Sequence, residues 1–275
     1  KITKPKLKGK SDNILLNLHF TLKNFKKVIF ENDFKDLLLT TFYYTFFGTV
    51  GSIIFGILTA QMVNQKFYGR TFMRSVLLFP YVAPVVALAY TWELLLDPNS
   101  GTLNSLLVNF QIIETPINLL GQKYLDISIF GFEFKLRLAL TTVIIFEIWR
   151  YFPLAFLFIL ARLQAIPKDL YEAAEVDRAS KWQQFIYITL PSVLPFLLLA
   201  LLFRGIENFK MFDMVVELTS GGPGSATELA SINLKREAFE KWKTGYSSAF
   251  AVILFVTIFG FGNVYVKVMN KIKER

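Results

Sequence analysis

The sequence predicts an all-α membrane protein, a polytopic helical bundle in which five transmembrane helices are visible. Of its 275 residues, 53% are hydrophobic and only 19% are charged, and the mean hydropathy is +0.44. Soluble domains contain about 45–50% apolar and about 25% charged residues. Such an excess also fits one large apolar core, so the lengths of the uncharged runs must decide.

Five runs are long and apolar enough to cross a bilayer, which takes about 20 helical residues. Leu138–Ala161 is interrupted only by Glu147 and Arg150. The other four carry no charge: Leu37–Val63, Ser75–Trp92, Phe185–Phe203 and Tyr246–Val266. Several such runs in one chain argue against a soluble fold with buried helices.

No segment between these runs is clearly a strand. Tyr124–Phe134 alternates in hydropathy, which fits a strand or an irregular extracytoplasmic loop. We find no internal repeat. The sequence therefore predicts one membrane domain over residues 37–268, between an N-terminal segment 1–36 and a tail 269–275.

Lys and Arg residues are concentrated in alternate loops, and this bias sets the orientation of a membrane protein. They are about 2.5 times as dense in Asn64–Arg74, Arg162–Gln184 and Lys267–Arg275 as in Glu93–Arg137 and Arg204–Gly245. The first three segments, including the C-terminal tail, are therefore predicted to be cytoplasmic.

Five spans then place Lys1–Asp36 outside the cytoplasm, although this segment contains nine lysines. A sixth, N-terminal span that precedes Lys1 would resolve the conflict, and a processed signal peptide is the alternative explanation for a start without methionine. Ile14–Phe30 is too short and too rich in lysine to be that span. A helix along the membrane interface fits it better.

The composition excludes several kinds of chemistry. The chain has no cysteine and a single histidine, His19, so disulfides and thiolate metal sites are absent, and a histidine-based zinc site or triad is disfavoured. No P-loop motif occurs. We therefore expect no cofactor and no metal on this chain. The net charge of +9 fits cytoplasmic loops better than a nucleic-acid surface.

The predicted cytoplasmic loop Arg162–Gln184 contains a short helix that begins near Pro167, a residue favoured in the first helical turn. Small or weakly apolar residues recur on it at spacings of three and four: Leu170, Ala173, Ala174 and Asp177. Such a face permits close approach of another protein, whose basic groups the carboxylates of Glu172 and Asp177 would pair with. A helix that rests on lipid headgroups fits the composition equally well.

The segment from Tyr171 to Pro191 resembles the EAA loop of binding-protein-dependent ABC permeases. The matching residues are Glu172, Ala173, Ala174, Asp177, Ala179, Ile188, Leu190 and Pro191. Downstream, Asp213 and Leu218–Pro223 resemble the sugar-type subunit of this family, which has a G-G-P loop. The resemblance covers nearly the whole chain.

This resemblance implies a MetI-like fold with six or more spans, in a bacterial inner membrane. It implies a permease subunit, without enzymatic activity of its own, that imports a sugar or related polyol by alternating access. The implied partners are an ATPase subunit that binds ATP and Mg²⁺, a second permease subunit and an extracytoplasmic solute-binding protein. The implied ATPase-coupling residues are Glu172, Ala173, Ala174, Asp177, Arg178 and Ala179.

Arg178 departs from the family pattern, which has glycine at this position. Glycine suits a turn with positive φ, where another residue costs about 1 kcal/mol. Either φ is negative here, or Arg178 accepts the strain and uses its charge on the ATPase surface. We expect positive φ.

Polar and aromatic residues near the spans are candidates for a substrate path. Glu147 and Arg150 are costly in lipid and should face the bundle interior, a water-filled path or each other, where a structural ion pair is the plainer alternative. The path candidates are Tyr90, Glu147, Trp149, Phe152, Glu207, Asn208 and Asp213. Trp92 fits an interfacial position better than a ligand contact.

Gly221-Gly222-Pro223 is expected to form a tight turn outside the membrane, before a helix that starts near Ala226. The family resemblance implies that this loop faces the binding protein.

Two alternative functions have sequence requirements of their own. A secondary transporter would need intramembrane coupling carboxylates, of which only Glu147 is clear, and a membrane enzyme would need clustered carboxylates or a metal site.

Overall fold

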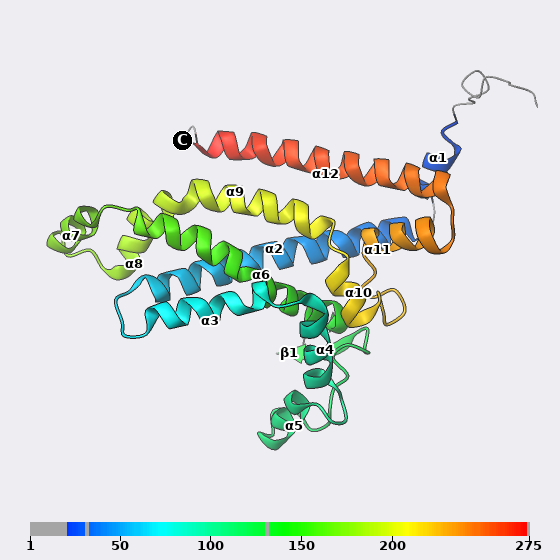
Figure 1. Cartoon of the computed structure of the whole chain (residues 1–275), viewed down its shortest axis with the longest axis horizontal. Coiled ribbons are helices and arrows are strands. Elements are labelled where there is room, and N and C mark those ends of the chain that lie inside the picture. Colours follow the sequence, from blue (N-terminus) through cyan, green and yellow to red (C-terminus); the bar gives the residue numbers. More distant parts are fainter. Residues whose placement is uncertain (1–20, 31–32, 130–131, 274–275) are drawn as a thin grey trace, which may run out of the picture.

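The computed structural model describes residues 21–30, 33–129 and 132–273, and there the chain is a bundle of long helices (Figure 1). Four of the helices described are long and apolar enough to cross a membrane. They are α2 (Phe34–Asn64), α6 (Leu138–Gln164), the continuous run Lys181–Phe209 and α12 (Thr244–Lys273). The remaining predicted span, Ser75–Trp92, corresponds to two helices, α3 (Arg70–Val82) and α4 (Val85–Leu96). The predicted all-α membrane fold is confirmed.

The predicted span Ser75–Trp92 is broken near its middle. Helices α3 and α4 meet at an angle of 95° on either side of Ala83 and Pro84. Ala83 is extended, with ψ 145°, because a following proline ring disfavours the helical conformation. Pro84 also lacks the N–H group that would bond to the Pro80 carbonyl. The prolines therefore turn the chain sharply instead of only kinking it.

Helices α2 and α6 form the closest packed pair, and glycines on α2 permit this approach. A Cβ atom on Gly56 would lie 2.7 Å from Cβ of Ala155 and 2.9 Å from the backbone nitrogen of Phe156. A Cβ atom on Gly51 would lie 2.2 Å from the Ile148 side chain. Small residues serve this purpose in membrane bundles, where tight packing replaces the hydrophobic effect.

The fourth span is longer than predicted. It consists of α8 (Lys181–Gln184), a π-helical turn over Phe185–Thr189, and α9 (Leu190–Phe209). The sequence placed the end of this span at Phe203 and assigned Arg204 to a loop, because a charge normally ends an apolar run. That assignment was wrong, since Arg204 lies within α9 and is buried.

Helix α12 lies against α9 (Figure 1), and the Tyr265 hydroxyl donates to the Leu198 carbonyl at 2.8 Å. Helix α1 (Lys23–Phe30) covers the beginning of α12, with Val28 buried beside Phe250. Helix α1 is the C-terminal part of the predicted interfacial helix Ile14–Phe30, of which residues 14–20 lie outside the described residues.

Connections of the two predicted sides lie at opposite ends of the bundle. The α2–α3 loop, α7 (Lys168–Val176), α8 and the end of α12 lie toward the left in Figure 1. The other connections contain α5 (Thr102–Asn109), α10 (Asp213–Thr219), α11 (Ala230–Lys235) and a π-helical turn over Arg236–Glu240. The described residues 125–129 and 132–134 of the segment Tyr124–Phe134 lie in strands. The segment contributes to an antiparallel hairpin of β1 (Leu125–Ile129) and β2 (Phe132–Leu136), as its alternation allowed.

Replacing Gly56 with alanine should destabilise the bundle by about 1–3 kcal/mol, because the added methyl group meets backbone atoms of α6 that cannot move aside. Gly262→Ala is the matched control, since its Cβ would meet nothing within 4 Å. Unfolding of both variants in detergent measures the difference. Equal stability of the two would contradict the packing described for α2 and α6.

Candidate functional site

The short helix predicted to begin near Pro167 is present as α7 (Lys168–Val176), and its role in docking stays a prediction. No residue of α7 is buried, and the side chains of Glu172 and Ala173 are exposed. The helix is nevertheless fixed to the bundle, because the hydroxyl groups of Tyr171 and Thr189 lie 2.8 Å apart and form a hydrogen bond. An exposed, anchored helix of this kind has the properties of a docking element.

The turn after α7 has the positive φ that the sequence predicted. Arg178 has φ +58°. Its N–H bonds to the Glu175 carbonyl at 3.0 Å, and the Ala179 N–H bonds to the Ala174 carbonyl at 2.8 Å. This pair of bonds is a Schellman motif, which normally has glycine at the left-handed position. The use that Arg178 makes of its charge stays a prediction.

Further contacts hold the loop around this turn. Ser180 and Gln183 form a reciprocal capping box at the start of α8. The Lys181 ammonium lies 2.6 Å from the Glu175 carboxylate, and this hydrogen bond holds the pKa of Glu175 below its ordinary value. The loop between α7 and α9 is thus ordered by its own contacts.

A second candidate site lies inside the bundle, around Glu147. This side chain is completely buried, and its carboxylate accepts hydrogen bonds from the guanidinium of Arg204 and, at 2.9 Å, from the Tyr44 hydroxyl. The alternative of an ion pair between Glu147 and Arg150 is not what the structure shows. Sequence reasoning missed Arg204, although its position on α9, four residues before Asn208, was a usable signal.

Arg150 instead serves the broken span. Its Nη1 atom donates to the carbonyl of Pro80 at 3.2 Å and to that of Ala83 at 3.0 Å. The first of these carbonyls is the one that Pro84 leaves without its helical donor. Arg150 therefore satisfies the backbone at the break between α3 and α4.

Neutral polar groups extend the buried cluster. Asn208 is fully buried and donates to the Thr49 hydroxyl at 3.0 Å, while its Oδ1 atom has no partner among the described residues. Gly48 makes room for these groups, since a Cβ atom there would lie 3.1 Å from both Asn208 and Glu147. The cluster thus joins α2, α6 and α9.

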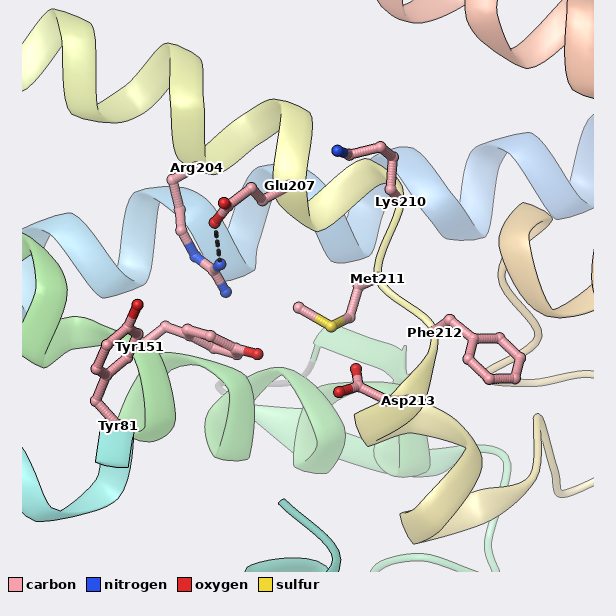
Figure 2. A pocket seen from close by; sticks show the side chains of 8 residues that line it. All are labelled: Tyr81, Tyr151, Arg204, Glu207, Lys210, Met211, Phe212 and Asp213. Carbon is pink, nitrogen blue, oxygen red and sulfur yellow. Dashed lines mark hydrogen bonds and ion pairs between the residues drawn. The ribbon is translucent and has the colours of Figure 1, made fainter. Parts of the chain in front are cut away.

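A cavity of about 400 Å³ opens beside this cluster (Figure 2). Its lining consists of Tyr81, Tyr151, Arg204, Glu207, Lys210, Met211, Phe212 and Asp213. Arg204 and Glu207 form an ion pair with a distance of 3.2 Å, and the Arg204 guanidinium stacks 3.6 Å from the centre of the Tyr151 ring. Two predicted path residues, Glu207 and Asp213, line this cavity, and Glu147 lies behind it through Arg204.

The remaining path candidates lie elsewhere. Tyr90 on α4 is 60% exposed and does not line the cavity. Trp149 packs on Trp92, with ring centres 5.4 Å apart, and Phe152 is buried against Phe55. Trp149 and Phe152 therefore serve as packing groups, whereas Tyr90 is exposed away from the cavity.

The Gly221-Gly222-Pro223 turn is fixed by Thr227. Gly221 has φ +87°, and Thr227 donates from its backbone to the Gly221 carbonyl at 3.2 Å and from its hydroxyl to the Gly222 carbonyl at 2.8 Å. The following helix, α11, begins at Ala230 and not near Ala226. The reason is that residues up to Thr227 are used to close the turn.

Comparison with known proteins gives consistent results. A family profile described as "Binding-protein-dependent transport system inner membrane component" matches residues 52–272. The chain is 34% identical, over 90% of its length and 78% of the relative's, to the trehalose/maltose transport system permease protein MalF of Thermococcus litoralis. It is also 34% identical, over 86% of its length and 75% of the relative's, to the inner membrane ABC transporter permease protein YcjO of Escherichia coli.

Solved structures show the same fold. A crystal structure of a bacterial ABC transporter for import of the acidic polysaccharide alginate contains a chain similar to this one, with a TM-score of 0.80 and 19% identity. The similarity covers 93% of this chain and 85% of that one. The predicted MetI-like helical architecture is therefore confirmed by its structural neighbours as well as by the sequence family.

Arg178→Gly should stabilise the docking turn by about 1 kcal/mol, because glycine adopts positive φ without strain. Hydrogen exchange at the Arg178 and Ala179 amides should then slow about fivefold. Ser180→Ala should act in the opposite direction, since it removes the capping box. Faster exchange in the glycine variant would show that Arg178 itself holds the turn.

Proposed function

Since the chain belongs to the family of binding-protein-dependent transport system inner membrane components, we propose that it is the permease subunit of an ABC importer for a sugar or related polyol. The chain is a multi-pass protein of the inner membrane. It would pair with a second permease subunit to form a heterodimer. An ATPase subunit and an extracytoplasmic solute-binding protein would complete the transporter.

The observation that carries this proposal is the exposed, anchored helix α7 with its EAA sequence. The carboxylates of Glu172 and Asp177 and the small side chains of Ala173 and Ala174 are all accessible or half-accessible to a partner. The sequence has no P-loop motif, so the nucleotide would be bound and hydrolysed by the partner subunit. In this arrangement α7 receives the movement of the ATPase, and Arg178 adds a positive charge at the same contact.

The path from α7 to the cavity supports coupling to transport. Lys181–Phe209 is one continuous helical run that starts three residues after Arg178 and ends at the cavity wall with Arg204 and Glu207. The Tyr171–Thr189 hydrogen bond ties α7 to the same run. A displacement of α7 would therefore move the cavity wall, which is the requirement for alternating access.

Related proteins support the substrate class. One relative is named for trehalose and maltose transport, and another, from Mycobacterium tuberculosis, is a trehalose transport system permease protein with 27% identity. One solved neighbour contains a periplasmic protein bound to an alginate pentasaccharide. By analogy, the Gly221–Pro223 loop, at the end of the bundle opposite α7, would face such a binding protein.

Ion-driven transport has less support. A coupling carboxylate must exchange its ion during the cycle, whereas Glu147 is held by Arg204 and Tyr44 inside the bundle. Its partners thus give it the role of a structural anion in this conformation.

Glu172→Lys should lower co-purification of the ATPase subunit at least tenfold, because it places a cation on a face whose carboxylates would pair with basic groups. Glu217→Lys on α10 is the matched control, with the same charge change on an exposed residue at the opposite end. Mass spectrometry of complexes purified in mild detergent measures both. Equal recovery of the ATPase from the two variants would overturn the assignment of α7 as the docking helix.

A further inference from the structure

We infer that the cavity beside Arg204 accepts an uncharged, polyhydroxylated ligand and rejects anionic carbohydrates. This inference rests on the proposed function and narrows its substrate class. It depends on three features of the cavity: the balance of fixed charges, the state of its one buried cation, and the position of its aromatic rings.

The fixed charges around the cavity are balanced, with no excess of positive charge. Glu207 and Asp213 line the cavity, and Glu147 lies directly behind it, whereas the cations are Arg204 and Lys210. A third cation, Arg150, lies behind the Tyr151 wall, with its guanidinium 5.5 Å from the centre of that ring, so three carboxylates are matched by three cations and no positive charge is in excess. A ligand with a carboxylate or phosphate group would add a further anion beside Glu207 and Asp213, and like charges in a partly dry cavity repel strongly.

The terminal nitrogens of the buried cation are already occupied, and its Nε atom, which has no hydrogen-bond partner among the described residues, is itself buried. The Arg204 side chain is only 6% exposed, and its two terminal nitrogens are used by the carboxylates of Glu147 and Glu207. One face of its guanidinium is covered by Tyr151. Recognition of carboxylate or phosphate by arginine normally uses that same pair of nitrogens as a fork. Arg204 would have to break a buried ion pair to bind an anion in this way.

The remaining groups suit the hydroxyls and ring faces of a neutral carbohydrate. The carboxylates of Glu207 and Asp213 accept hydrogen bonds, and every ligand hydroxyl can donate one. The Tyr81 and Tyr151 rings lie 6.1 Å apart with planes inclined by 73°, and they form one wall (Figure 2). The Tyr81 ring, which is 40% exposed, offers apolar contact to C–H groups, and the hydroxyls of both rings add polar contacts. The volume of about 400 Å³ is within the range of small-molecule sites, which hold a ligand of limited length at one time.

This cavity therefore lacks the available cation that an importer of acidic polysaccharide requires. A transporter for sugar acids or glycerol phosphate needs a cation that is available to the ligand. Among the described residues that line this cavity, Lys210 is the only cation without a carboxylate partner in an ion pair. Its single positive charge is opposed by the carboxylates of Asp213 and Glu207, which line the same cavity, so it does not reverse the charge of the site.

The test uses the purified transporter complex, with both permease subunits and the ATPase, and without the binding protein, so that the membrane cavity alone selects. Binding of trehalose, maltose and mannitol is compared by calorimetry with binding of a mannuronate disaccharide and glycerol 3-phosphate. At least one neutral probe should bind ten times more tightly than either anion. The double change Glu207→Gln and Asp213→Asn should weaken binding of the neutral ligand. It should also reduce the ratio of neutral to anionic affinity at least fivefold. Glu217→Gln, outside the cavity, should change neither ratio.

Tighter binding of the mannuronate disaccharide or of glycerol 3-phosphate would overturn the inference. So would failure of every neutral probe to bind while the ATPase remains attached. Loss of the ATPase from the wild-type complex would instead count against the proposed function, so the two failures are distinguishable.

Discussion

A charge buried in an apolar bundle must find its counter-charge within the protein, because hydrocarbon supplies neither water nor ions. Glu147 and Arg204 meet this requirement for each other, with side chains 0% and 6% exposed. The Tyr44 hydroxyl adds a second contact to Glu147, a hydrogen bond of 2.9 Å. These three residues belong to α6, α9 and α2, so a single electrostatic unit fixes the relative positions of the three central helices.

The same requirement explains how the break between α3 and α4 is accommodated. Hydrogen-bonding groups of the backbone cannot remain unsatisfied at membrane depth. Pro84 removes one donor, and Arg150 supplies another from α6, to the carbonyls of Pro80 and Ala83. The break brings Tyr81 to the cavity, where it faces groups from α6 and α9. The polar residues of the membrane interior thus both hold the bundle together and shape the cavity.

The sequence predicts the parts of this structure that depend on local pattern. Uncharged runs of sufficient length identify the spans, and the spacing around Glu172 identifies α7. The glycine expected at Arg178 identifies a turn with positive φ. The sequence does not predict features that depend on tertiary contact. Arg204 ends an apolar run when only the sequence is considered, and its burial depends on Glu147, which lies 57 positions earlier.

Two other differences have related causes. A proline pair predicts a kink, but neither the angle of 95° nor the two hydrogen bonds by which Arg150, on another helix, satisfies the break can be deduced from the prolines alone. The alternating pattern behind the hairpin β1–β2 is short, and it fits a loop equally well. Only the antiparallel pairing of the two strands, which the sequence does not show, distinguishes a hairpin from a loop. For the site, the sequence identified Glu207 and Asp213, whereas the tyrosines that join them in the cavity depend on how the helices pack.

The central claim is that Glu147 and Arg204 act as one unit, and a double-mutant cycle measures this directly. The quantity is the free energy of unfolding in mixed detergent micelles for Glu147→Gln, Arg204→Gln and the double variant. Each single change should cost about 3–5 kcal/mol, because it leaves the other charge buried without its partner. The double variant should be more stable than the sum of the single effects predicts by at least about 1.5 kcal/mol. Single effects that add to within about 0.5 kcal/mol would show that the two side chains do not depend on each other, and would contradict the account.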